Sequence, residues 1–272
     1  MTSLPKNSAT LTSLVSVKID LLFESQLLAG GSAFFYEHNG QNYLVTNWHN
    51  VTGRDPLTKK AKHSCAAIPD KIRIAIPGVY EGGMLKFIDV ELGLYRDEDR
   101  KIPIWWEHPV HFEKVDLAVI PIGNALQKGL LRAIKMVTAN GHNVSNSEVQ
   151  FRAGQDVFII GFPRLMDGEG LAIWKRGSIA TEPTIELGGL PKLYIDTATR
   201  EGMSGSPVFA SGLISTRTSG QQISGLAIRN RFLGIYSGRV GDDTFLAQLG
   251  VVWKESAIVE TILGKMVGNS SF

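Results

Sequence analysis

Ser204 stands in a segment that could carry nucleophilic chemistry. The stretch Thr199–Phe209 reads TREGMSGSPVF, with Gly202 two residues before the serine and Gly205 directly after it. A serine hydroxyl becomes a nucleophile when a base lies within hydrogen-bond reach and a third group orients that base. A turn between two strands would also use glycine and serine. The segment by itself leaves both interpretations open.

The order of the histidines along the chain narrows the choice of base. All six histidines precede Ser204. An α/β-hydrolase places its histidine after its serine and ends its Gly-x-Ser-x-Gly motif in glycine, where this chain has Ser206, so that arrangement is excluded. The subtilisin order needs an aspartate ahead of the histidine, and only Asp20, in an ordinary strand pattern, precedes His49. The order histidine, aspartate, serine remains.

Two segments supply the first two members of that order. In NYLVTNWHNVTG, residues 42–53, an apolar strand pattern ends at His49 in a polar turn. In EKVDLAVIPI, residues 113–122, Asp116 opens a run that is otherwise apolar. A carboxylate at the start of a buried strand is costly unless it is paired, and an imidazole N–H would pair with it. We therefore predict His49 as the base and Asp116 as the group that orients it.

The elements that must position these residues are short strands. Apolar and β-branched runs separated by turn residues predict strands at 14–23, 32–38, 42–47, 71–77, 86–95 and 115–122, and then at 155–163, 171–180, 192–199, 206–210, 222–228, 231–238 and 249–253. Many short strands without alternating helices indicate antiparallel barrels or sandwiches.

The rest of the pattern predicts two units and few helices. Apolar spacing predicts helical structure in 124–137 and a closing helix over 254–266, whereas the Ser-, Thr- and Gly-rich stretch 211–222 predicts a surface loop near the active cleft. We place the first unit at 10–135 and the second at 145–272.

Composition sets the boundaries for function. The chain has 272 residues, of which 43% are hydrophobic and 20% charged, and this predicts a globular protein with ample core. A net charge of +2 is too small to indicate a nucleic acid or an anionic membrane as partner. The single cysteine, Cys65, excludes an intramolecular disulfide, and the first 25 residues lack the layout of a signal peptide, so we expect a soluble cytoplasmic protein.

The segments TNWHNV, VDLAVIPI and GMSGSPV, in this order, resemble those of the trypsin-like (chymotrypsin-fold) serine proteases, in the disulfide-free form common among bacterial proteins. GSAFF (31–35) lies upstream of the histidine, as in that family. The resemblance implies an all-β fold of two antiparallel six-stranded β-barrels, with the active site in the cleft between them and a C-terminal α-helix. It also implies that His49 and Asp116 come from the first barrel and Ser204 from the second, with the backbone N–H groups of Gly202 and Ser204 as the oxyanion hole.

Departures from the family pattern bear on activation and specificity. Met203 stands where the family's zymogens carry the aspartate that pairs with a newly cut N-terminus, so we do not expect activation by N-terminal cleavage. The resemblance implies a substrate pocket formed by Ala198, Thr199, Ser237, Gly238, Arg239 and Gly250. Because no acidic residue is at its floor, cleavage after Lys or Arg is disfavoured.

Three functions remain open at this point. The first is a serine endopeptidase acting on polypeptides; the second is a protease-fold binding module that is latent until an activating protein partner binds; the third is a non-proteolytic serine esterase. His63 with Cys65, and His108 with His111, would suit a metal, but neither pair brings further ligands at a persuasive spacing. We expect no metal and no cofactor.

Overall fold

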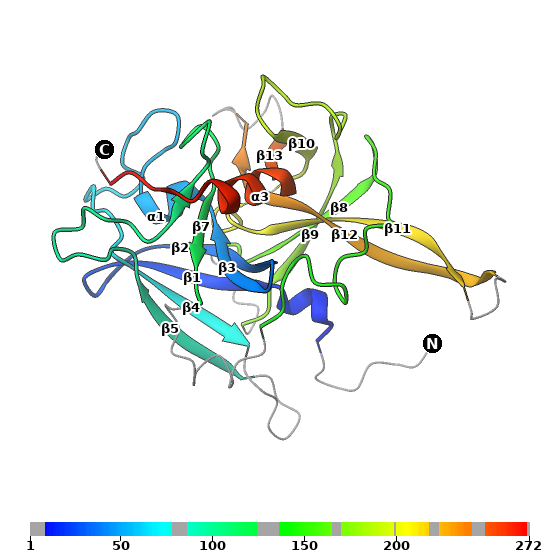
Figure 1. The fold of residues 1–272 in the computed structure, drawn as a ribbon, viewed down its shortest axis with the longest axis horizontal. Helices are drawn as coiled ribbons and strands as arrows, with labels where there is room; N and C mark the ends of the chain where they lie inside the picture. Colours follow the sequence, from blue (N-terminus) through cyan, green and yellow to red (C-terminus); the bar gives the residue numbers. More distant parts are fainter. Residues whose placement is uncertain are drawn as a thin grey trace.

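The computed structural model describes residues 9–77, 86–123, 136–164, 170–198, 200–217, 223–240 and 248–270. Two groups of strands lie side by side, the first half of the chain in one and most of the second half in the other (Figure 1). Within the described ranges, no helix has the length and apolar character needed to cross a bilayer. The segment 124–137, expected to be helical, lies almost entirely outside them.

The first group is an eight-stranded sheet in the order β14-β6-β7-β3-β2-β1-β4-β5. Its strands are β1 (Ser16–Phe23), β2 (Gln26–His38), β3 (Gln41–Thr46), β4 (Lys71–Pro77), β5 (Phe87–Gly93), β6 (Trp106–Glu107), β7 (Ala118–Pro121) and β14 (Met266–Val267). A short 3₁₀ helix, η1 (Leu11–Leu14), precedes β1. The sequence pattern explains the strands, because alternate residues of β4, Ile72, Ile74 and Ile76, are all fully buried.

The second group is a closed six-stranded barrel in the order β10-β13-β12-β11-β8-β9. Its strands are β8 (Asp156–Gly161), β9 (Ile173–Ile179), β10 (Lys192–Asp196), β11 (Pro207–Arg217), β12 (Ile223–Arg239) and β13 (Leu249–Lys254). All strand pairs in both groups are antiparallel.

The all-β class, the antiparallel barrel in the second half and the C-terminal helix are confirmed. In the first half, the described strands form a sheet that is not closed. Two strands of two residues each, β6 and β14, widen it, and they are too short to produce an alternating sequence pattern.

The prediction of a surface loop at 211–222 was wrong for the part that the structure describes. β11 continues to Arg217, and β12 is a single strand of 17 residues where two strands were expected. The two form a long hairpin that projects from the barrel on the side away from α1 (Trp48–Thr52) (Figure 1). The stretch is rich in serine, threonine and glycine, a composition typical of loops, and composition alone does not reveal that β11 and β12 pair along it.

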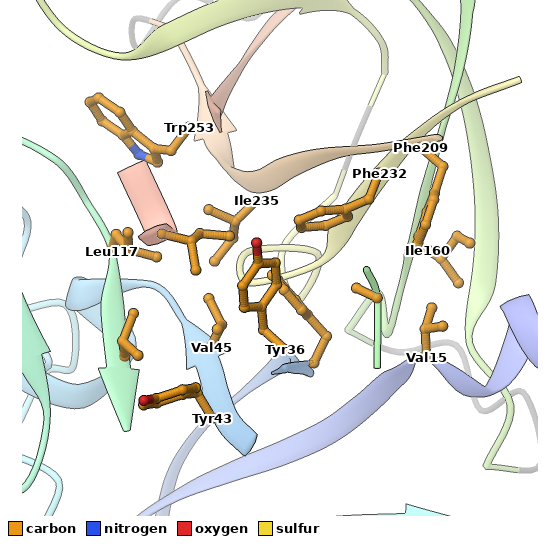
Figure 2. Packing of buried hydrophobic residues seen from close by; sticks show 14 of the residues in the cluster. Val15, Tyr36, Tyr43, Val45, Leu117, Ile160, Phe209, Phe232, Ile235 and Trp253 are labelled. Atoms are coloured by element: carbon orange, nitrogen blue, oxygen red, sulfur yellow. The ribbon is translucent and has the colours of Figure 1, made fainter. Parts of the chain in front are cut away.

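A hydrophobic core joins the two groups. Figure 2 shows Tyr36, Val45 and Leu117 of the first group meeting Ile160, Phe209, Phe232, Ile235 and Trp253 of the second. Phe232 packs against both Phe34 and Phe209, with ring centroids 5.3 and 5.6 Å apart. Helix α3 (Glu255–Gly264) adds Ala257, Ile258 and Ile262 to the same core. The barrel and the sheet therefore share one apolar interface, and this interface fixes the position of one group of strands relative to the other.

Candidate active site

His49 lies in a helix of one turn that follows β3. Asn47 adopts an extended conformation as the N-cap of α1, and Gly53 ends the helix in the left-handed region with φ 65°. Trp48, beside the histidine, donates its indole N–H to the buried Glu107 of β6 at 2.9 Å. The short helix is thus anchored to the first sheet directly beside His49.

Asp116, which lies two residues before β7 begins, is hydrogen-bonded to the histidine. Its Oδ2 lies 2.6 Å from His49 Nδ1, and its Oδ1 accepts the backbone N–H of His49 at 2.9 Å. Asn47 donates its side-chain amide to the Asp116 carbonyl at 2.7 Å. The structure therefore brings together His49 and Asp116, which lie 67 residues apart in sequence.

Ser237 of β12 completes the surroundings of this carboxylate. Its hydroxyl donates to Asp116 Oδ2 at 2.5 Å, a contact between the barrel and the first sheet. Burial alone would raise the pKa of Asp116, but the charge of His49 and the hydrogen bonds from His49 and Ser237 outweigh it, so the pKa of Asp116 lies below its ordinary value. The carboxylate stays ionised and can hold the N–H of the imidazole.

Ser204 lies in a tight turn that leads into β11. Gly202 and Gly205 on either side of it both have φ of 90°, a region that side chains with a Cβ rarely adopt. A Cβ on Gly202 would come within 2.4 Å of the Phe162 carbonyl, and one on Gly205 would come within 1.8 Å of the Ser32 carbonyl. Both glycines are required by backbone conformation and by space.

Hydrogen bonds fix the carbonyl groups of this turn one after another. Glu201 C=O accepts from the Arg164 N–H at 2.7 Å, Gly202 C=O from the Ser32 hydroxyl at 2.9 Å, Met203 C=O from the Ser206 N–H at 3.1 Å and Ser204 C=O from the Ser32 N–H at 3.0 Å.

The N–H groups of the same turn fall into two sets. Those of Met203, Gly205 and Ser206 bond to the carbonyls of Arg200, Tyr236 and Met203. In the part of the chain that the structure describes, no hydrogen bond uses the N–H of Gly202 or of Ser204. Because C=O and N–H point in opposite directions across a trans peptide, the bonds to Glu201 C=O and Met203 C=O also set the direction of these two N–H groups.

His49 and Ser204 line the same cleft, a cavity of about 280 Å³ between the first sheet and the barrel. Gly202 lies in its wall, together with Leu28, Lys62 and Arg164. The Ser204 hydroxyl donates to the carbonyl of Ser237 at 3.5 Å, and no hydrogen bond joins it to His49 within the described ranges. The cleft thus has a hydroxyl, an imidazole and two directed backbone N–H groups at one place.

The residues expected to form the substrate pocket do not line this cavity, as far as the structure describes them. Ala198, Ser237, Gly238, Arg239 and Gly250 are not among the residues that line this cavity, and Thr199 lies outside the described residues. Arg239 pairs with Gly250 across β12 and β13, and Gly250 is packed against the ring of Tyr236. The assignment of a substrate pocket to these residues stays a prediction.

Two contributors to the site were missed at the sequence level. Ser32 was part of the GSAFF segment but received no role, and Ser237 was placed in the pocket wall and not on Asp116. A serine has no sequence signal for contacts with residues more than a hundred positions away, so only the fold could reveal them.

In the first pair considered for a metal the two side chains contact each other, and in the second pair His108 contacts a residue outside the pair. His63 Nδ1 lies 2.8 Å from Cys65 Sγ, and His108 Nε2 lies 3.0 Å from Glu260 Oε2. Among the described residues there is no group of three or more His, Cys, Asp or Glu side chains that could hold a metal ion.

Comparison with known proteins places this site in a family. Residues 31–212 match the model of the trypsin-like peptidase domain. Among solved structures, the chain is similar to the Rv3671c protease of M. tuberculosis in its active form (16% identity, TM-score 0.49, covering 96% of this chain and 85% of that one). It is also similar to a serine endoprotease of Yersinia pestis (16% identity, TM-score 0.49, covering 93% of this chain and 63% of that one). No curated protein sequence matches the chain significantly.

Proposed function

Because the chain belongs to the trypsin-like peptidase family, we propose that it hydrolyses peptide bonds through an acyl-enzyme formed on Ser204. Membership of this family makes the protein a serine endopeptidase, a hydrolase whose substrate is polypeptide. The observation that carries the proposed residue roles is the contact of 2.6 Å between Asp116 and His49, which lines the cleft together with Ser204.

His49 acts as the general base and then as the general acid. Its Nδ1 is held by Asp116, which leaves Nε2 for the Ser204 hydroxyl. When the hydroxyl turns from the Ser237 carbonyl toward His49, Nε2 takes its proton as the oxygen attacks the substrate carbonyl. The imidazolium then gives that proton to the departing amine. Water repeats the sequence on the acyl-enzyme and releases the new carboxylate.

The N–H groups of Gly202 and Ser204 stabilise the negative charge that forms on the substrate oxygen. Support for this role comes from the hydrogen bonds of the turn, which engage the neighbouring N–H groups and leave these two available. Donors that are fixed before the reaction do not have to reorganise as charge develops. This pattern favours an active enzyme over a latent binding module, in which the Glu201–Gly202 peptide would be turned the other way.

A fluorophosphonate probe followed by intact mass measurement tests the proposal. We expect one adduct on the wild-type protein at Ser204, no adduct on Ser204→Ala and a much slower one on His49→Ala. Ser147→Ala and His142→Ala, which change exposed residues away from the cleft, serve as matched controls and should react like the wild type. With a peptide substrate, kcat should fall by about 10⁴- to 10⁶-fold in the two site variants.

The outcomes separate the three candidate functions. Cleavage of peptides by the isolated protein supports the endopeptidase. Turnover of small esters without any cleavage of peptide libraries would favour the esterase. A wild-type protein that gains an adduct only after a second protein is added would favour activation by a partner.

A further inference from the structure

We infer that Ser32 is a positioning residue that holds the turn around Ser204 in the form that directs the oxyanion donors. This inference rests on the proposed function, because it concerns the same Gly202 and Ser204 N–H groups. Ser32 itself does not line the cleft, so it acts through the turn and not on the substrate.

Every polar group of Ser32 is engaged. Its N–H donates to the Ser204 carbonyl at 3.0 Å, and its own carbonyl accepts from Thr46 Oγ1 at 2.9 Å. Its hydroxyl donates to the Gly202 carbonyl at 2.9 Å and accepts the Phe162 N–H at 3.0 Å. One residue therefore bonds to the carbonyls of both proposed oxyanion residues.

The direction of the hydroxyl proton follows from these partners. A backbone N–H can only donate, so the oxygen of Ser32 must accept from Phe162. The hydroxyl has a single proton, and the Gly202 carbonyl is the acceptor that receives it. The chemistry of the two partners thus sets the direction of the bond to Gly202, and no other acceptor in the described structure competes for the hydroxyl proton.

The position of Ser32 makes this support specific. The residue lies in β2 of the first sheet and is fully buried, whereas Gly202 lies 170 residues later, in the second half of the chain. The carbonyl of Ser32 also occupies the space that a Cβ on Gly205 would need, so the turn lies directly on the strand. Ser32 is the point at which the first sheet determines the shape of the turn.

The same residue connects the turn with the helix that carries His49. Thr46 Oγ1, which donates to the Ser32 carbonyl, accepts from Asn50 Nδ2 at 2.9 Å, and that amide lies 3.5 Å from the Ser204 carbonyl. Ser32, Thr46, Asn50 and the Ser204 carbonyl form a closed ring of contacts next to the reacting groups. Removal of the Ser32 hydroxyl leaves this set and both backbone contacts of Ser32 in place and frees only the Gly202 carbonyl and the Phe162 N–H.

Ser32→Ala is the direct test, with Ser16→Ala as its control. Ser16, in the neighbouring strand β1, is also a buried serine, and its hydroxyl has no hydrogen-bond partner in the described structure. For Ser32→Ala we expect kcat on a peptide substrate to fall by about 10- to 100-fold, less than the 10²- to 10³-fold loss typical of deleting a donor outright. Both donors keep the bonds that direct them, and only the Gly202–Met203 peptide between them loses its anchor. KM should change by less than about threefold. Ser16→Ala should keep the wild-type kcat.

A peptide aldehyde supplies a readout that a purely structural role would not move. It adds to the serine and places an oxyanion in the proposed hole, whereas the corresponding peptide carboxylic acid binds without forming that group. We expect the affinity of Ser32→Ala for the aldehyde to fall by the same factor as kcat and its affinity for the acid to remain unchanged. Rates are expressed per active site titrated with the fluorophosphonate, so a partly unfolded preparation does not imitate the effect.

Three results would overturn the inference: full kcat in Ser32→Ala, a loss that falls on KM, or a loss of kcat without loss of aldehyde affinity. If Ser32→Ala does not fold, Ser32→Cys replaces the hydroxyl by a thiol, which is a weak donor. In that variant too, kcat and the affinity for the aldehyde must fall by the same factor. A wild-type protein that reacts with no fluorophosphonate refutes the proposed function itself, whereas a reactive wild type with an unaffected Ser32→Ala refutes only the role of Ser32.

Discussion

At the scale of single residues, three hydrogen bonds converge on the carboxylate of Asp116. Two come from His49, through its ring and its backbone N–H, and the third comes from the hydroxyl of Ser237. The third bond crosses from the barrel to the first sheet, so the orientation of the imidazole depends on both halves of the chain. Ser237 therefore belongs to the support of the base as much as to any pocket wall.

Ser237→Ala should weaken both catalysis and stability. Loss of a hydrogen bond to a charged group is worth about 1.5–3 kcal/mol in proteins, and we expect kcat/KM to fall by about tenfold, measured beside Ser147→Ala. The folded-state pKa of Asp116 lies below its ordinary value, so its ionised form stabilises the fold above that value. The stability deficit of Ser237→Ala in urea unfolding should be present at neutral pH and shrink as the pH falls through the pKa of Asp116. A deficit that is the same at every pH would contradict this role.

At the scale of elements, the turn from Gly202 to Ser206 depends on a backbone that only glycine can follow. Its two glycines have the same positive φ. In addition, backbone atoms occupy the space that a Cβ would need at either position. Conformation and space make separate contributions to the cost of a side chain here. Gly154, in the turn before β8, allows the two contributions to be measured separately.

Gly205→Ala and Gly154→Ala form that matched pair. Gly154 has φ of 82° but no atom within 4 Å of a built Cβ, whereas a Cβ on Gly205 would lie 1.8 Å from the Ser32 carbonyl. We expect Gly154→Ala to lower the free energy of unfolding by about 1–2 kcal/mol, the cost of positive φ alone. Gly205→Ala should lose more than about 4 kcal/mol and its reaction with the fluorophosphonate. Stability is measured by thermal and urea unfolding. If the two variants lost the same amount of stability, the lack of space around Gly205 would make no contribution.

Elements with strong patterns could be read from the sequence, and those defined by distant contacts could not. β4 was predicted at its observed bounds because its isoleucines alternate, and His49 and Asp116 were placed because each ends or opens an apolar run. β6 and β14 have two residues each and exist because they pair with distant strands. In the sequence, Ser32 does not differ from other serines in strands. Its role follows only from its contact with Gly202, which the fold brings next to it.

At the scale of the whole molecule, helix α3 ties the end of the barrel to the first sheet. The Tyr36 hydroxyl of β2 donates to Glu255 Oε1 at 2.9 Å, and His108 meets Glu260 of the same helix. Burial raises the pKa of Glu255 above its ordinary value, although the hydrogen bond from Tyr36 and the charge of Arg231 act against this. The contact therefore holds a carboxylate where its charge is unfavourable.

Glu255→Gln should stabilise the protein at neutral pH. A carboxyl group with a raised pKa in the folded state contributes its full stability below its ordinary pKa and loses it as the pH rises through the folded-state value. The glutamine keeps an acceptor for Tyr36 and carries no charge. Urea unfolding should show a gain for Glu255→Gln at pH 7 that disappears near pH 4, whereas the exposed Glu148→Gln should show none. A loss of stability at pH 7 would mean that the charge of Glu255 is favourable where it lies.

The contact between Asn269 and Glu107 sets an order of events in a growing polypeptide. Asn269 N–H donates to the same Glu107 oxygen that holds Trp48 beside His49, yet it follows Glu107 by 162 residues. Chains leave the ribosome with the N-terminal part first and fold in that direction. A nascent chain that has made His49 and Asp116 still lacks Ser204, and one that has made Ser204 still lacks the strand and the donor that complete the anchor of α1. The anchor beside His49 is therefore completed only after all three proposed catalytic residues have been made.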